Sequence, residues 1–225
     1  MIMALQEYVV ARPAESLLAT NKLLRNTYLL LSMTLLFSAA TAGIAIATNM
    51  PFMGPLLTLG GYFGLLFLTT HLRNSAWGLL SIFALTGFMG LTLGPMINAY
   101  LKFYSNGGQL VMLAMGGTGA IFLGLSAYAL STRKDFSFLG GYVFVGILVA
   151  FLAGIGALIF NLPALSLAVS AVFIMLMSGF ILYQTSAMIH GGETNYIMAT
   201  IALYVSIYNL FTSLLHLLGA FSGRN

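Results

Sequence analysis

The sequence predicts an all-α, polytopic membrane protein built as a bundle of seven transmembrane helices. Three observations predict this class: only 5% of the 225 residues are charged, 60% are hydrophobic with a mean hydropathy of +1.01, and seven apolar runs approach the length that a bilayer requires. Soluble domains carry about 25% charged residues. A hydrocarbon core of about 30 Å needs roughly 20 apolar residues per helix, and the 25 glycines suit helices that pack closely in lipid.

The predicted spans follow one another with short polar or turn-forming segments between them. They cover about residues 28–48, 52–70, 76–100, 109–130, 138–160, 164–189 and 196–220. In the third span, "LGPM" (Leu93 to Met96) predicts a kink or an early helix end, because proline removes one helical hydrogen bond. The small residues 39–43 resemble a signal-peptide cleavage pattern, but the apolar run continues to Thr48, which favours a retained first helix.

The positions of Lys and Arg predict the orientation of the chain. With a cytoplasmic N-terminus, two basic residues fall on the outer side, Lys102 and Arg224, and six on the inner side: Arg12, Lys22, Arg25, Arg73, Arg133 and Lys134. Cytoplasmic segments carry the excess of Lys and Arg. We therefore expect an inner (plasma) membrane protein with a cytoplasmic tail, residues 1–26, and a seven-helix domain, residues 27–225, that ends in the periplasm.

The composition argues against several classes of function. The chain has no cysteine, which excludes disulfides, thiolate metal sites and cysteine nucleophiles. The net charge of +4 is interpreted as a signal of topology and not of nucleic-acid binding. "HGG" (His190 to Gly192) resembles an oxyanion-hole loop, but no Gly-x-Ser-x-Gly elbow accompanies it, and the only aspartate, Asp135, lies in a predicted loop. We expect neither an enzyme nor a cofactor.

The polar stretch "HGGETNYI" (residues 190–197) separates the sixth and seventh spans. His190 and Glu193 are two possible metal ligands, with His71 on the same side of the membrane. A metal ion would need about two more ligands, and the two glycines argue against the helix that would align the pair. The alternative is a turn that joins two helices.

As a turn, this stretch has suitable residues at both helix ends. A positive His190 is favoured at a helix C-terminus, where Gly191 can take a left-handed cap conformation. Glu193 precedes the seventh span, which Thr194 or Asn195 can cap. Glu193 is also expected to pair with Arg73 or Arg133, forming a cytoplasmic latch between helix ends.

Small residues recur at helix-packing spacing in three spans. The three sets are Gly116, Ala120 and Gly124 in the fourth span, Gly146, Ala150 and Gly154 in the fifth, and Gly87, Gly90, Gly94 and Asn98 in the third. Small residues let helix backbones approach one another in membranes. The first two sets predict packing faces, and the third predicts a face that is either tightly packed or beside a cavity.

One face of the seventh span is small or polar throughout. Its members, spaced alternately four and three residues apart, are Asn195, Ala199, Ala202, Ser206, Asn209, Ser213 and His216. This face must point into the bundle, as an interhelical hydrogen-bond seam or as a water-lined path, with Gln184 as its expected polar partner. No charged residue lies in the middle of a span, which disfavours coupled transport but not a passive leak.

Four blocks resemble the YccA branch of the Bax-inhibitor family of seven-helix membrane proteins. They are "KLLRNTYLLLSMTLLFSA" (residues 22–39), "STRKDFSFLGG" (131–141), "LPALSLAVSAVFI" (162–174) and "HGGETNYIMATIALYVSIYNLFTSLLHLLG" (190–219). The resemblance covers nearly the whole chain from Lys22. It implies association with the membrane-anchored AAA protease FtsH and restraint of its proteolysis, the protease engaging the tail formed by residues 1–26.

The wider family implies an alternative, a passive calcium leak channel. In such members an acid in the sixth helix and another in the seventh form a pH-sensitive latch. Here Gln184 and Ser206 stand at these positions, and an amide and a hydroxyl cannot share a proton as two carboxylates can. The alternative is therefore a cation leak without the di-acid latch, along a path lined by Gln184, Ser206, Asn209 and Ser213.

Overall fold

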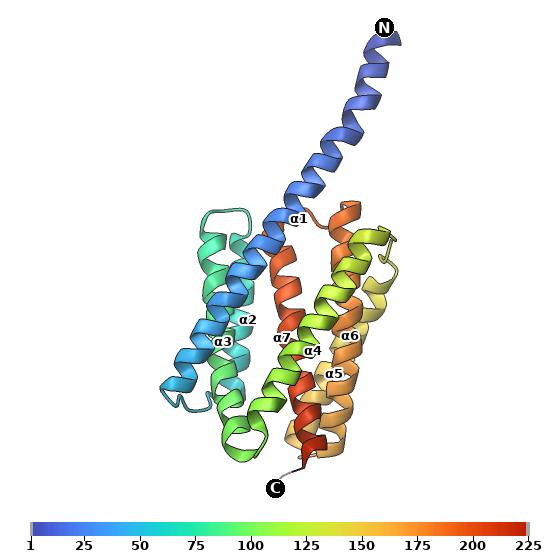
Figure 1. Cartoon of the computed structure of the whole chain (residues 1–225). Helices are drawn as coiled ribbons and strands as arrows, with labels where there is room; N and C mark the ends of the chain where they lie inside the picture. The colour runs from blue at the N-terminus through green and yellow to red at the C-terminus, as the bar shows by residue number, and fades with distance from the viewer. Residues whose placement is uncertain (1, 224–225) are drawn as a thin grey trace.

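The computed structural model describes the backbone of residues 2–223 and the side chains of residues 19–223. Within that range it is an all-helical bundle without strands (Figure 1). The helices are α1 (Ile2–Ala47), α2 (Pro55–Leu72), α3 (Trp77–Phe103), α4 (Gly107–Thr132), α5 (Leu139–Ile159), α6 (Pro163–His190) and α7 (Tyr196–Ser222). Seven helices are long and apolar enough to cross a membrane. The predicted fold class and number of spans are confirmed.

The bundle has two ends, which we call upper and lower as drawn in Figure 1. The α2–α3, α4–α5 and α6–α7 connections lie at the upper end, and the end of α7 lies at the lower end with the other three connections. Helix α1 begins at Ile2 and continues without a break into the first span. Its first turns extend beyond the upper end of the bundle.

Helix α7 forms the centre of the bundle, where it contacts α1, α3, α4 and α6. Its Leu203, Leu210 and Leu215 are fully buried. Helix α2 is the least enclosed span, with only 6% of its residues buried, and large apolar side chains such as Phe67 project outward from it. This distribution suits a bilayer, because lipid tails accept apolar side chains that water would not.

Two prolines begin helices, and a third is accommodated inside one. Pro55 and Pro163 occupy the first turns of α2 and α6, where the missing N–H removes no helical bond. Pro95 lies inside α3, which continues to Phe103. Of the two predicted alternatives at this proline, a kink or an early helix end, the early end is therefore excluded.

The two predicted small-residue faces of α4 and α5 differ in outcome. On α5, a Cβ added to Gly146 would lie 2.5 Å from Leu176 of α6, and Ala150 is buried. On α4, a Cβ added to Gly116 or Gly124 would meet no atom of another helix within 4 Å. The packing prediction holds for α5 and is wrong for α4, because α4 packs through its opposite face, which includes the buried Phe122.

The glycine face of α3 packs against α1. A Cβ added to Gly87 would lie 2.6 Å from the Phe37 ring, and Gly90 lies directly over Ser38. Of the two predicted alternatives, tight packing is therefore the one observed. At the lower end of this face, Asn98 Nδ2 donates to Asn49 Oδ1 at 3.2 Å, which ties α3 to the turn after α1.

Candidate functional site

The turn between α6 and α7 combines a glycine cap with an asparagine cap. Gly191 adopts φ 81° and donates its N–H to Ala187 O, the left-handed C-cap expected there. Asn195 Oδ1 accepts from the N–H groups of Ile197 and Met198 at 3.0 and 3.1 Å, which makes Asn195 the N-cap of α7. Its Nδ2 also donates to Arg73 O at 3.1 Å and so links α7 to the α2–α3 connection.

The carboxylate of Glu193 accepts hydrogen bonds within this turn. Its Oε1 accepts from the N–H groups of Thr194 and Asn195 at 2.8 and 2.7 Å. The expected ion pair with Arg73 or Arg133 is not observed: both arginines are exposed at the upper end, and neither is bonded to Glu193. A carboxylate that accepts two backbone N–H bonds just before the N-terminus of α7 is already stabilised there. Among the described residues, no three His, Cys, Asp or Glu side chains group as a metal site.

Ser186 holds the α4–α5 connection to the end of α6. Its Oγ accepts from the N–H of Phe136 at 2.9 Å and lies 3.3 Å from Lys134 O. His190 Nδ1 lies 3.2 Å from the same hydroxyl. The α4–α5 connection and α6 are therefore joined by hydrogen bonds of the buried Ser186 and not by an ion pair between Arg133 and Glu193. Sequence reasoning missed Ser186, which no pattern distinguished from its neighbours.

Asp135 in this connection is exposed and bonded to Ser137. The Ser137 hydroxyl and N–H donate to Asp135 Oδ1 at 2.5 and 2.8 Å. These bonds, the hydroxyl first, lower the pKa of Asp135, and the nearby His190 adds a smaller effect in the same direction. The carboxylate is thus kept charged among the basic residues of the upper end.

The predicted polar face of α7 lies inside the bundle. Ala199, Ser206 and Ser213 are buried. However, Ser206 Oγ donates to Ala202 O at 2.8 Å and Asn209 Nδ2 to Val205 O at 2.8 Å, both within α7. In the middle of the helix, Ser206 and Asn209 therefore donate to the backbone of α7 itself and not to another helix.

Only the two ends of this face bond other segments. Asn195 reaches the α2–α3 connection at the upper end, as described above. At the lower end, His216 Nδ1 and the Ser170 hydroxyl of α6 lie 2.8 Å apart. A cavity of about 350 Å³ adjoins this pair and is also lined by Ser213 and Tyr100. The seam is thus two separate cross-links and not a continuous interhelical network.

Gln184 is buried but does not bond the polar face of α7. It is 5% exposed, and its Nε2 has no hydrogen-bond partner. Four more buried side-chain oxygens share this condition among the described residues, and they belong to Thr27, Tyr28, Ser126 and Thr185. All five groups lie in the upper halves of the membrane-spanning parts of α1 (Ala19–Ala47), α4 and α6. Each unpaired buried polar group lowers the free energy of unfolding by roughly 1–3 kcal/mol. Among the described residues, these unpaired groups are concentrated in this part of the bundle.

Helices α1, α3 and α7 meet at a junction centred on Tyr204. The phenol of Tyr204, 2% exposed, donates to Thr86 O of α3 at 3.2 Å, and its oxygen lies 2.6 Å from Ser38 Oγ of α1. Because the single phenol proton goes to Thr86, Ser38 is the donor in the second bond. One turn further along α3, Gly90 lets the two helix backbones meet at Ser38. We call Ser38, Thr86, Gly90 and Tyr204 the α1 junction.

Sequence reasoning did not identify this junction. The glycine face of α3 was visible as a pattern, but its partner helix was not. Tyr204 does not belong to the polar face traced from Asn195 to His216, because it lies on another side of α7. The available signal was weak, because Ser38 and Thr86 are only two of several hydroxyl residues in these largely apolar spans.

Comparison with known proteins now identifies the family. The model of the family described as inhibitor of apoptosis-promoting Bax1 matches residues 20–223. The chain belongs to this Bax-inhibitor family. The match covers all seven spans, so the family assignment rests on the whole bundle and not on one motif.

Several bacterial proteins resemble this chain over nearly their full length. The modulator of FtsH protease YccA of Escherichia coli is 52% identical over 210 residues, which are 93% of this chain and 94% of that protein. An uncharacterized protein of Pseudomonas aeruginosa is 51% identical over 218 residues, 97% and 98% of the two chains. A membrane protein of Vibrio cholerae is 42% identical over 212 residues, 94% and 95% of the two chains.

Proposed function

We propose that this protein lies in the bacterial inner membrane and modulates an FtsH-type membrane protease by occupying it unproductively. Its similarity to the modulator YccA, at 52% identity over 93% of the chain, supports the proposal. A second similar protein is named for the inner membrane. The protein would present a tail to the protease and then resist being pulled out of the bilayer.

The observation that carries this mechanism is the double role of α1. Its N-terminal turns project from the upper end of the bundle (Figure 1), and residues 2–26 correspond to roughly 37 Å of helix at 1.5 Å per residue. The same helix is fixed lower down by the α1 junction, where Ser38 bonds Tyr204. A force applied to the tail therefore acts directly on the most closely packed contact between α1 and α3.

The charge distribution supports a cytoplasmic position for the tail. Lys22, Arg25, Arg73, Arg133 and Lys134 are exposed at the upper end, whereas Lys102 lies at the lower end and donates to Asn49 Oδ1 at 2.8 Å. Arg12 and Arg224 lie outside the residues whose side chains are described. An upper end facing the cytoplasm follows the positive-inside rule, and it leaves the C-terminus in the periplasm.

Removal of the tail tests the first step. A variant that starts at residue 21 behind an initiator Met should no longer co-purify with the protease in mild detergent, and degradation of a reporter membrane substrate should return to its unrestrained rate. The full-length protein is the positive control. Undiminished co-purification of the shortened protein would refute the role of the tail.

Loosening the α1 junction tests the second step. The double variant Ser38→Ala, Tyr204→Phe keeps the tail and should still bind the protease, but it should be degraded faster than the wild type. Tyr142→Phe, at a residue 78% exposed on α5, is the matched control and should be as long-lived as the wild type. Equal lifetimes for all three proteins would show that the junction does not limit extraction.

The geometry does not favour the leak path as a second function. Ser206 and Asn209 bond their own helix backbone, and Gln184 is not hydrogen-bonded to either of them. Calcium prefers six to eight oxygen ligands, several of them carboxylates. The middle of α7 offers it no carboxylate.

A further inference from the structure

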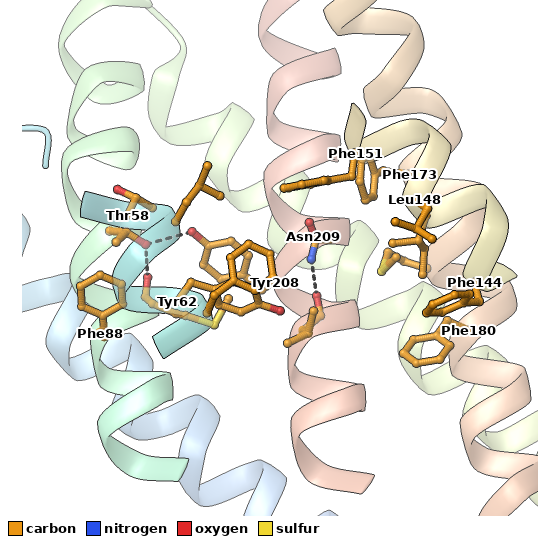
Figure 2. A pocket seen from close by; sticks show the side chains of 17 residues that line it. Thr58, Tyr62, Phe88, Phe144, Leu148, Phe151, Phe173, Phe180, Tyr208 and Asn209 are labelled. Atoms are coloured by element: carbon orange, nitrogen blue, oxygen red, sulfur yellow. Dashed lines mark hydrogen bonds between the residues drawn. The ribbon is translucent and has the colours of Figure 1, made fainter. Parts of the chain in front are cut away.

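The bundle contains a cavity of about 430 Å³ between α2 and α5 (Figure 2). Five helices line it: α2, α3, α5, α6 and α7. The rings of Phe88, Phe151, Phe173 and Phe180 form much of its wall. Asn209 of the polar face of α7 also lines this space, but the turn between α6 and α7 and the α1 junction lie outside it.

The cavity lies at the middle of the membrane-spanning helices. Met89, Phe151, Met177 and Asn209 line it, and each lies within two residues of the midpoint of its own helix. In a bilayer this depth is the centre of the hydrocarbon core. The molecules available there are hydrocarbon chains, because water and headgroups are largely excluded from the core.

The cavity opens sideways between two helices that do not pack along each other. Among the described residues, α2 packs on α3 and α5 on α6, and one edge-on ring pair, Phe63 with Phe151, joins α2 to α5 at 6.1 Å between centroids. Phe63 is 48% exposed and Leu148 is 47% exposed. These side chains stand between the cavity and the surrounding lipid.

Most residues of the wall are apolar, and three of its five polar side chains, Thr92, Tyr208 and Asn209, bond protein atoms. Thr92 Oγ1 and the Tyr208 hydroxyl lie 2.9 Å apart, and Asn209 Nδ2 donates to Val205 O at 2.8 Å (Figure 2). An apolar ligand can therefore occupy the cavity without breaking these bonds. Large cavities with apolar walls exclude water and accept apolar molecules.

The size of the cavity decides which apolar molecule fits. A helix of a partner protein is about 10–12 Å wide, whereas the rings of Phe63 and Phe151 already meet between α2 and α5 at 6.1 Å between centroids, which leaves no room for a helix to enter there. Small-molecule sites typically measure about 300–1,000 Å³. A flexible hydrocarbon chain fits within this space and can bend around the rings.

We propose that this cavity binds one acyl chain of a bilayer phospholipid, which enters between α2 and α5 past the Phe63–Phe151 pair. The headgroup stays at the membrane surface while the end of the chain reaches Met89 and Met177 at the inner wall. Both methionines are nearly fully buried, at 5% and 2% exposed, so lipid that only surrounds the bundle cannot touch them. This site does not depend on the proposed modulation of a protease.

Photolabelling tests the proposal directly. The full-length protein is reconstituted in vesicles of phosphatidylethanolamine and phosphatidylglycerol that contain a small share of phosphatidylcholine with a diazirine at the end of one acyl chain. After illumination, mass spectrometry maps the adducts. We expect adducts on Met89 and Met177, and also on Met175, which is 75% exposed and reports the surrounding lipid.

Two tryptophan variants on α5 form a matched pair. Leu148→Trp fills the cavity and should remove the adducts on Met89 and Met177 while those on Met175 remain. Leu152→Trp lies one turn away, is 62% exposed and does not line the cavity, so its adducts should match the wild type. Because Leu148→Trp can also disturb folding, Phe63→Ala serves as a variant of opposite sign, which widens the mouth and should increase the yield on Met177.

Three outcomes would overturn the proposal. The first is labelling confined to outward residues such as Met175 in the wild type. The second is unchanged labelling of Met89 and Met177 in a folded Leu148→Trp protein. The third is loss of these adducts with an excess of isoprenoid quinone but not with the same excess of unlabelled phosphatidylcholine, which would assign the cavity to a quinone.

Discussion

Replacement of Tyr204 by phenylalanine tests the α1 junction most directly. The variant keeps the ring and removes only the hydroxyl, which bonds Thr86 O at 3.2 Å and Ser38 Oγ at 2.6 Å. Because Tyr204 is 2% exposed, water cannot reach the site and replace the lost hydroxyl. Hydrogen bonds between membrane helices contribute about 0.6 kcal/mol on average and up to about 1.7. The loss of two such bonds should lower the free energy of unfolding by about 1–2 kcal/mol.

Thermal unfolding in mild detergent, followed by circular dichroism, measures this effect. For a chain of this length, 1 kcal/mol corresponds to a decrease of about 2–4 °C in Tm. Ser38→Ala and the double variant complete a cycle that isolates the bond between the two side chains. The cycle should give a coupling of about 0.6–1.7 kcal/mol. If the effects of the two substitutions simply add, Ser38 and Tyr204 do not interact, and the account of α1 as a locked helix fails.

Four further predictions concern other parts of the bundle. Gln184→Leu removes an unpaired buried amide and should raise the free energy of unfolding by about 1–3 kcal/mol; a lower Tm would show that Gln184 is bonded in the folded protein. Gly146→Leu should destabilise the bundle, because its Cβ would lie 2.5 Å from a side chain of α6. Gly116→Leu lies on the open face of α4 and should leave Tm within about 1 °C of the wild type. Equal decreases in Tm for the two variants would contradict the assigned packing of α4 and α5. The hydrogen bonds from Ser137 lower the pKa of Asp135 in the folded protein. The contribution of Asp135 to stability is therefore present above the ordinary carboxyl pKa of about 3.9, and it is lost as pH falls through the lower folded-state pKa. Acidification should lower the Tm of Ser137→Ala less than that of the wild type; an equal decrease would show that the Ser137 hydroxyl does not lower the pKa of Asp135. Liposomes containing the protein should show no calcium flux above empty liposomes, while flux that decreases on Asn209→Leu would restore the leak path.

The turn from His190 to Asn195 shows what a local pattern predicts well. The left-handed cap at Gly191 and the cap at Asn195 depend on backbone groups only a few residues away. The prediction of an ion pair between Glu193 and a distant arginine was wrong. Glu193 bonds the N–H groups next to it and not an arginine of another connection, because adjacent donors are available without the loss of side-chain freedom that a distant ion pair requires.

The packing faces show the same limit. The third, fourth and fifth spans carry similar spacings of small residues, but only the α3 and α5 faces meet other helices. A spacing of four residues says which side chains share a face, not which face the neighbours cover. For α4, the face with Phe122 is the one enclosed.

The sequence by itself determined the class, the number of spans and the family of this protein. The class and the number of spans depend on hydropathy over a length fixed by the bilayer, and the family depends on the similarity of nearly the whole chain to the family model. Only the tertiary structure decided that Tyr204 joins α1 to α3, that Gln184 lacks a partner and that a cavity opens between α2 and α5. The physical reason is that helices in lipid are apolar on all sides, so hydrophobicity sets where a helix lies, and close packing and single hydrogen bonds set which of its faces is enclosed.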